Sequence, residues 1–75
     1  MSEENYRTVL DEAMEELPTT QKRILEMLRN NVLIDSQDPT VPTISKALGK
    51  SEKTIRNQRD KAIAAIKAFV NKGEH

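Results

Sequence analysis

A glycine at position 49 separates two stretches with helical patterns and restricts what this chain can fold into. Glycine adopts positive φ angles without steric penalty, so Gly49 can end one helix and turn the chain sharply. Ser51 can then cap the next helix by accepting a hydrogen bond from a backbone N–H two or three residues later. The sequence therefore predicts a helix-turn-helix within residues 41–72. Three apolar residues beside the turn are assigned to the core: Ile44, Leu48 and Ile55.

The spacing of the apolar residues predicts an all-α fold, a single four-helix domain over residues 1–75. The expected helices span residues 3–17, 18–31, 41–48 and 51–72, and the last of them is much the longest. The apolar stripe of the first helix comprises Tyr6, Val9, Leu10, Ala13, Met14 and Leu17. The stripe of the last helix comprises Ile55, Ala62, Ile63, Ile66, Phe69 and Val70.

Prolines and a threonine mark the expected helix boundaries. Pro18 interrupts the first pattern and is tolerated in the first turn of the next helix, where its missing N–H removes no hydrogen bond. Thr40 is the expected N-cap of the third helix, with Pro42 in the first turn. The apolar run 32–34 (Val-Leu-Ile) is too short for a strand, and we expect it to pack into the core beside a polar surface loop.

Composition excludes several classes of site. The chain has no cysteine and one histidine, at position 75, so we expect neither a disulfide nor a metal site. It lacks a histidine-based catalytic set and a phosphate-binding glycine loop, so we expect no enzyme, no catalytic residues and no cofactor. No apolar run approaches the roughly 20 residues that span a membrane, and the N-terminus is acidic. We expect a cytoplasmic protein without membrane contact.

Charge is polarised along the chain although the total is zero. Residues 1–20 carry six acidic side chains and one arginine, a net charge of −5, whereas residues 46–72 carry eight cationic and two acidic side chains, a net charge of +6. A chain polarised in this way can present a positive face to nucleic acid. The same lysines can also serve only to keep an exposed helix soluble, so charge leaves both interpretations open.

The first turns of the last helix carry side chains that can donate hydrogen bonds to DNA. Arg56 can form a bidentate pair with guanine O6 and N7, and Asn57 can do the same with adenine N6 and N7. For Arg59 the alternative to a phosphate contact is a salt bridge to Asp60 or to the acidic first helix. Phosphate contacts, which fix register without reading sequence, are predicted for Lys46, Lys50, Ser51, Thr54, Arg59 and Lys61.

Three segments, in this order, resemble the fourth conserved region of bacterial sigma factors. Residues 17–25 (LPTTQKRIL) resemble its leucine-proline opening, residues 43–49 (TISKALG) its first motif helix, and residues 51–67 its recognition helix. The resemblance covers about residues 9–70. It implies a domain that docks the recognition helix in the major groove of a promoter −35 element and contacts the β-subunit flap of RNA polymerase. The base-contacting positions that it implies are Glu52, Lys53, Arg56 and Asn57.

The chain departs from the family pattern within the recognition helix. Where the family often has arginine followed by glutamate, this chain has Glu52 followed by Lys53, and Asn57 replaces a frequent glutamine. We therefore expect the docking mode of the family but not its usual −35 sequence. Glu52 can accept from cytosine N4 or cap the helix with Ser51, and we favour capping. Polar residues also stand where apolar ones are usual, at Lys50 and Gln58.

Two interpretations of function follow. The leading one is a sequence-specific DNA-binding domain in bacterial transcription, either the C-terminal domain of a longer sigma factor or a small free-standing regulator. The initial methionine slightly favours the second form. The alternative is a helical protein–protein interaction module that binds polymerase or a sigma factor and no DNA, motivated by the acidic first helix and the zero net charge. We expect a monomer, or a weak dimer through Phe69 and Val70.

Overall fold

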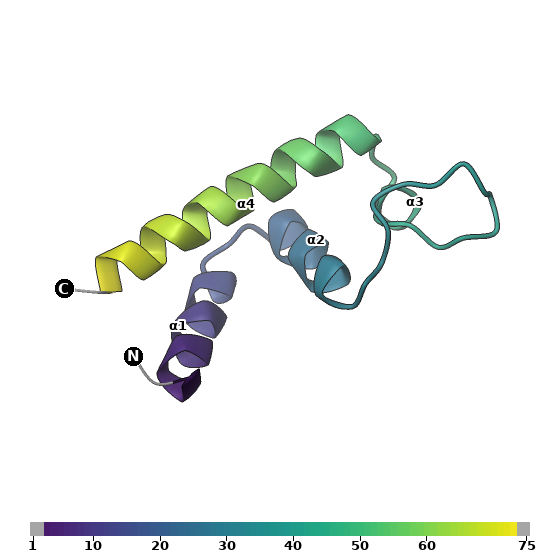
Figure 1. Cartoon of the computed structure of the whole chain (residues 1–75). Helices are drawn as coiled ribbons and strands as arrows, with labels where there is room; N and C mark the ends of the chain where they lie inside the picture. Colours follow the sequence, from purple (N-terminus) through teal and green to yellow (C-terminus); the bar gives the residue numbers. More distant parts are fainter. Residues whose placement is uncertain (1–2, 74–75) are drawn as a thin grey trace.

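The structure, a computed structural model, describes residues 3–73, so His75 lies outside the described residues. It contains four helices, namely α1 (Glu3–Glu15), α2 (Thr19–Arg29), α3 (Ile44–Leu48) and α4 (Glu52–Gly73). Figure 1 shows α4 as one long rod, and α1, α2 and α3 all contact it. The predicted all-α class is therefore confirmed. None of the described helices combines the length and the apolar character required to cross a bilayer.

The core lies where α2, α3 and α4 meet. Each of these helices contributes one fully buried isoleucine: Ile24, Ile44 and Ile55. Since the three side chains form one cluster, they fix the position of α3 and of the first turns of α4 relative to α2. The predicted core positions Ile44 and Ile55 are confirmed. Half-buried apolar residues surround the cluster, namely Met27, Leu28, Val32, Ile34 and Leu48.

The contact between α1 and α4 buries two alanines and a leucine. Ala13 on α1, Leu17 in the following turn and Ala62 on α4 are buried, as their apolar stripes predict. Ile63 was expected in the same stripe as Ala62, but it is 38% exposed. Successive residues of a helix point about 100° apart, so a helix that turns Ala62 inward carries Ile63 to the edge of the contact.

Most helix ends lie one or two residues from their predicted positions. α1 ends at Glu15 instead of residue 17, and α2 begins at Thr19 because Pro18, with φ −54° and ψ 149°, stands at its N-cap. α2 ends at Arg29, and Asn31 then takes a φ of 64°, which turns the chain out of the helix.

The start of α3 differs most, because Thr43 caps this helix and Thr40 does not. Thr43 is extended, with φ −136° and ψ 160°, and its hydroxyl accepts from the Lys46 N–H at 3.2 Å. Thr40 donates instead to Asp38 Oδ1, from its hydroxyl at 2.7 Å and from its N–H at 2.9 Å. These two hydrogen bonds lower the pKa of Asp38. The predicted cap was therefore wrong, and Pro42 precedes the helix.

The segment that joins α2 to α3 pairs with the chain just before α3. Leu33 and Thr43 form a parallel bridge, and the N–H of Ile44 donates to the Leu33 carbonyl at 2.9 Å. Side chains alternate along extended backbone, so Val32 and Ile34 pack against the core while Leu33 is 54% exposed. The expectation that this whole run is buried is right for two residues and wrong for Leu33.

Replacing Gly49 by alanine is expected to lower the free energy of unfolding by about 1 kcal/mol. Gly49 has a φ of 64° and a ψ of 35° at the C-cap of α3, a conformation that strains any residue with a Cβ. A Cβ built there meets no atom within 4 Å, so the backbone alone sets the cost. Chemical unfolding followed by circular dichroism measures the change.

Asn31→Gly provides the matched control, since Asn31 has the same φ of 64°. Glycine relieves the strain there but loses more entropy on folding, so the stability should stay within about 0.5 kcal/mol of the wild type. An unchanged stability in Gly49→Ala would contradict the left-handed conformation at the turn.

Candidate nucleic-acid interface

Two serines fix the turn between α3 and α4. Ser45 Oγ donates to the carbonyl of Lys50 at 2.6 Å, and the Lys50 N–H donates back to the Ser45 carbonyl at 3.1 Å. Ser51 Oγ accepts from the Thr54 N–H at 3.2 Å, which confirms the predicted cap of α4. Ser51 also donates to the Thr54 hydroxyl at 3.0 Å. The direction in which α4 leaves Gly49 is therefore held by hydrogen bonds on both sides of the turn.

The first turns of α4 present one continuous polar face. Ile55 is buried, while Lys53, Arg56 and Asn57 are exposed on the far side of the helix. This face carries an open depression of about 470 Å³, and all four predicted base-contacting side chains line it. Its complete lining is Glu52, Lys53, Arg56, Asn57, Arg59 and Asp60.

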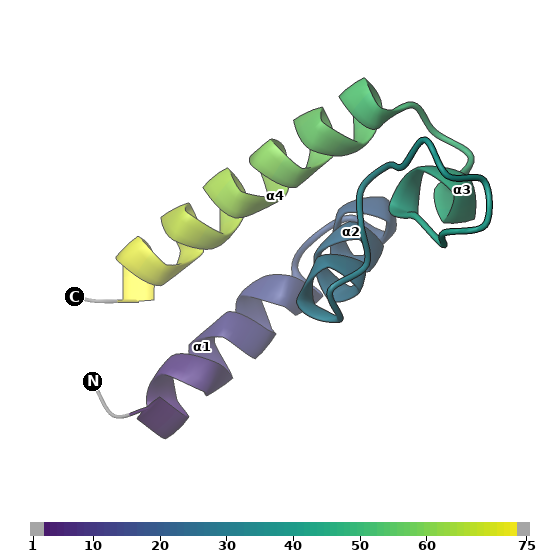
Figure 2. The ribbon, with the colours of Figure 1, turned by 45° about the vertical axis from the view of Figure 1, so that its right-hand side comes forward.

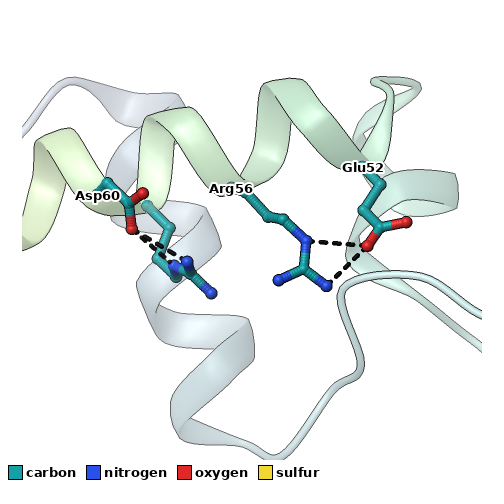
Figure 3. Close-up of polar contacts among 4 residues, drawn as sticks. Glu52, Arg56 and Asp60 are labelled. Carbon is teal, nitrogen blue, oxygen red and sulfur yellow. Dashed lines mark hydrogen bonds and ion pairs between the residues drawn. The ribbon is translucent and has the colours of Figure 1, made fainter.

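Glu52 and Arg56 form an ion pair one helical turn apart, as Figure 3 shows. Arg56 donates to Glu52 Oε1 from Nε at 2.8 Å and from Nη2 at 2.7 Å. The Arg56 side chain is 51% exposed and the Glu52 side chain 44%. A pair of this spacing and exposure stabilises a helix by only about 0.3–0.5 kcal/mol. The cap hydrogen bond comes from Ser51, so Glu52 has a different role from the one that the sequence favoured.

Arg59 also has an acidic neighbour. Its Nε and Nη2 donate to Asp60 Oδ1 at 3.1 and 3.0 Å, which is the salt-bridge alternative considered from the sequence. Next to it, Gln58 Oε1 accepts from Gln21 Nε2 at 3.0 Å and ties α4 to α2. A phosphate contact by Arg59 stays a prediction for the DNA-bound state, in which phosphate oxygens compete with Asp60.

Two of the remaining predicted phosphate contacts, Ser51 and Thr54, are hydrogen-bonded to each other in the cap of α4. The three lysines fall into two groups. Lys50 and Lys61 are exposed beside the polar face. Lys46 instead binds the loop before α3. Its ammonium group has three N–H donors and donates to three carbonyls there. These belong to Asp38, Pro39 and Val41, at 3.1, 3.0 and 2.9 Å. Lys46 thus fastens the loop to α3, and a phosphate could reach it only by displacing these bonds.

An apolar groove of about 540 Å³ is the feature that sequence reasoning missed. Its residues come from α1, α2 and α4, and Figure 2 shows the N-terminal end of α1 and the C-terminal end of α4 at the same end of the molecule. The apolar stripes of α1 and α4 pointed to such a groove, because they hold more apolar residues than the core buries. Among the described side chains of both stripes, the half-buried residues outnumber the buried ones. The groove is lined by Leu10, Met14, Leu25 and Ile66, with Arg7, Asp11 and Arg29.

The structure thus gathers Glu52, Lys53, Arg56 and Asn57 on one face, places Lys50 and Lys61 beside it, and directs Lys46 to the loop before α3. Within the depression three cationic and two acidic side chains leave a net charge of +1. Comparisons of the chain with protein-family models, with curated proteins and with solved structures give no match.

Proposed function

We propose that this chain is a sequence-specific DNA-binding domain of bacterial transcription, which places the first turns of α4 in the major groove of a promoter element. One observation carries the proposal: Lys53, Arg56 and Asn57 are exposed together, directly after the left-handed turn at Gly49 and opposite the buried Ile55. A helix with its side chains is about 10–12 Å across and fits a major groove about 12 Å wide.

Each exposed side chain on this face has chemistry that suits a base pair or a phosphate. Arg56 offers parallel N–H groups to guanine O6 and N7, and Asn57 offers a donor and an acceptor to adenine. Lys50 and Lys61 flank them as phosphate contacts, together with the first backbone N–H groups of α4. Contact with the polymerase β flap and a cytoplasmic location belong to this proposal through the resemblance to sigma factors.

Selection of bound duplexes from a random pool, followed by titration at several salt concentrations, tests the proposal. A defined motif should emerge, and its affinity should fall steeply with salt. Each phosphate contact contributes about 0.9 log unit per log unit of salt, so cationic contacts from Lys50, Arg59 and Lys61 give a slope near −3. Recovery of no motif, or binding that is independent of salt, would overturn the proposal.

Lys50→Gln is expected to reduce that slope by about one. Lys22→Gln is the matched control, because Lys22 lies on α2 and its Nζ binds Glu15 at 2.9 Å. That hydrogen bond raises the pKa of Lys22, so the control removes a charge that is fully present at neutral pH. An equal change of slope in both variants would show that net charge alone drives binding.

The apolar groove favours a second candidate, a helical module that binds polymerase or a sigma factor and no DNA. Leu10, Met14, Leu25 and Ile66 line this groove of about 540 Å³ and offer apolar side chains to the apolar face of a partner. The same titration separates the candidates. This second one requires that no duplex binds even at low salt and that the partner is retained by a variant such as Arg56→Ala.

A further inference from the structure

We propose that Glu52 is a specificity-determining residue that positions the guanidinium group of Arg56 for a single guanine. The inference rests on the proposed function of α4 and adds to it the residue that decides how Arg56 is used. The sequence resemblance places a base contact at position 52, whereas this inference gives Glu52 an indirect role through Arg56.

The ion pair leaves one edge of Arg56 available. A guanidinium group has five N–H donors in a fixed planar arrangement. Glu52 Oε1 accepts from Nε at 2.8 Å and from Nη2 at 2.7 Å, which occupies the side edge of the group. The two parallel N–H bonds at the tip, one on Nη1 and one on Nη2, stay free of Glu52. That tip edge is the one that matches guanine O6 and N7.

Glu52 also penalises the competing use of Arg56. In Figure 3 the Arg56 side chain is turned back along α4 toward Glu52, and both side chains belong to the depression on the polar face. If Arg56 swung away to a phosphate, the Glu52 carboxylate would lose its partner beside the negative DNA backbone. Binding to an unrelated sequence would then carry an electrostatic cost that the guanine complex avoids.

The face contains its own matched control. Asp60 lies on the same side of α4 and accepts from Arg59 at 3.0–3.1 Å, with no hydrogen bond to Arg56. Both carboxylates are exposed and belong to an ion pair within α4. Asp60→Asn and Glu52→Gln therefore make the same change in net charge, but only Glu52→Gln weakens the hold on Arg56.

The test measures dissociation constants for a duplex selected from a random pool and for the same duplex with its Arg56-dependent G·C pair changed to A·T. That pair is the one whose replacement no longer matters in Arg56→Ala. Discrimination is the dissociation constant for the A·T duplex divided by that for the selected duplex. We expect Glu52→Gln to reduce this ratio by about fivefold, a part of what a complete bidentate pair supplies. Affinity for an unrelated duplex should rise by about threefold in both Glu52→Gln and Asp60→Asn, because each removes a negative charge.

Three outcomes would overturn the inference. The first is an unchanged ratio in Glu52→Gln, and the second is an equal fall in Asp60→Asn. The third is a loss of affinity for the selected duplex, but not for an unrelated one, when Glu52→Gln is added to Arg56→Ala, since that would place Glu52 on a base itself. A wild-type protein that binds no duplex would instead overturn the proposed function, and the inference with it. Unchanged circular dichroism in each variant shows that binding, and not folding, has been measured.

Discussion

Ile55→Ala is expected to lower the free energy of unfolding by about 3 kcal/mol. Ile55 is fully buried and packs with Ile24 of α2 and Ile44 of α3. Truncation to alanine leaves a cavity that its neighbours fill only in part. At roughly 0.05–0.15 kcal/mol per residue, a domain of this size has a total stability of about 4–11 kcal/mol. The loss is therefore a large share of what holds α4 to α2 and α3.

Chemical unfolding followed by circular dichroism measures this loss, and Ile63→Ala is the matched control. Ile63 lies on the same helix but is 38% exposed, so its truncation should cost about 1 kcal/mol or less. Equal losses in the two variants would contradict a core centred on the three isoleucines. The comparison also separates packing from helix propensity, because both variants replace isoleucine by alanine within α4.

Features that depend on neighbours in the sequence could be predicted. The left-handed conformation of Gly49 and the cap from Ser51 each involve residues within three or four positions of one another. The residue types at the turn are therefore enough to predict both. The burial of Ile24, Ile44 and Ile55 follows from apolar spacing alone, since each is an inward position of a helical stripe. The helix-turn-helix prediction needed only these features.

Features that depend on the path of the loop could not be predicted. Thr40 and Thr43 are both acceptable N-caps by residue type. The choice is made by Asp38, which binds Thr40, and by the bridge between Leu33 and Thr43, ten positions apart. The same bridge turns the Leu33 side chain outward. Lys46 was predicted to contact a phosphate because of its charge and its place near the turn, but the loop brings three carbonyls within reach of its ammonium group.

The polar face lies between these two cases. Helical spacing predicts that Glu52, Lys53, Arg56 and Asn57 share one side of α4, and the structure places them around one depression. Glu52 and Arg56 also have the i, i+4 spacing at which opposite charges pair on a helix, although this pair was not among the predictions. The preference for capping over a base contact at Glu52 missed the ion pair, because the energies of capping and of pairing are similar and small.

Arg56→Ala is expected to weaken binding to the selected duplex by about tenfold to a hundredfold, which corresponds to about 1–3 kcal/mol. The side chain is half exposed in the free protein and donates to the Glu52 carboxylate from Nε and Nη2, so its tip edge is available to a guanine. Alanine removes both N–H donors of that edge and leaves O6 and N7 unpaired in the interface. Binding to an unrelated duplex should fall by only about twofold to threefold, the effect of one lost charge.

Two further variants decide whether Arg56 reads a base or merely adds charge. Arg56→Lys keeps the charge but loses the planar pair of donors, so it should recover binding to unrelated duplexes without recovering discrimination. Arg23→Ala removes an exposed arginine from α2, outside the polar face, and should leave discrimination unchanged. If Arg56→Ala weakened binding to every duplex equally, or if Arg56→Lys discriminated as well as the wild type, Arg56 would act as a phosphate contact. The reading of sequence would then have to come from Lys53 and Asn57, whose side chains share the same exposed face.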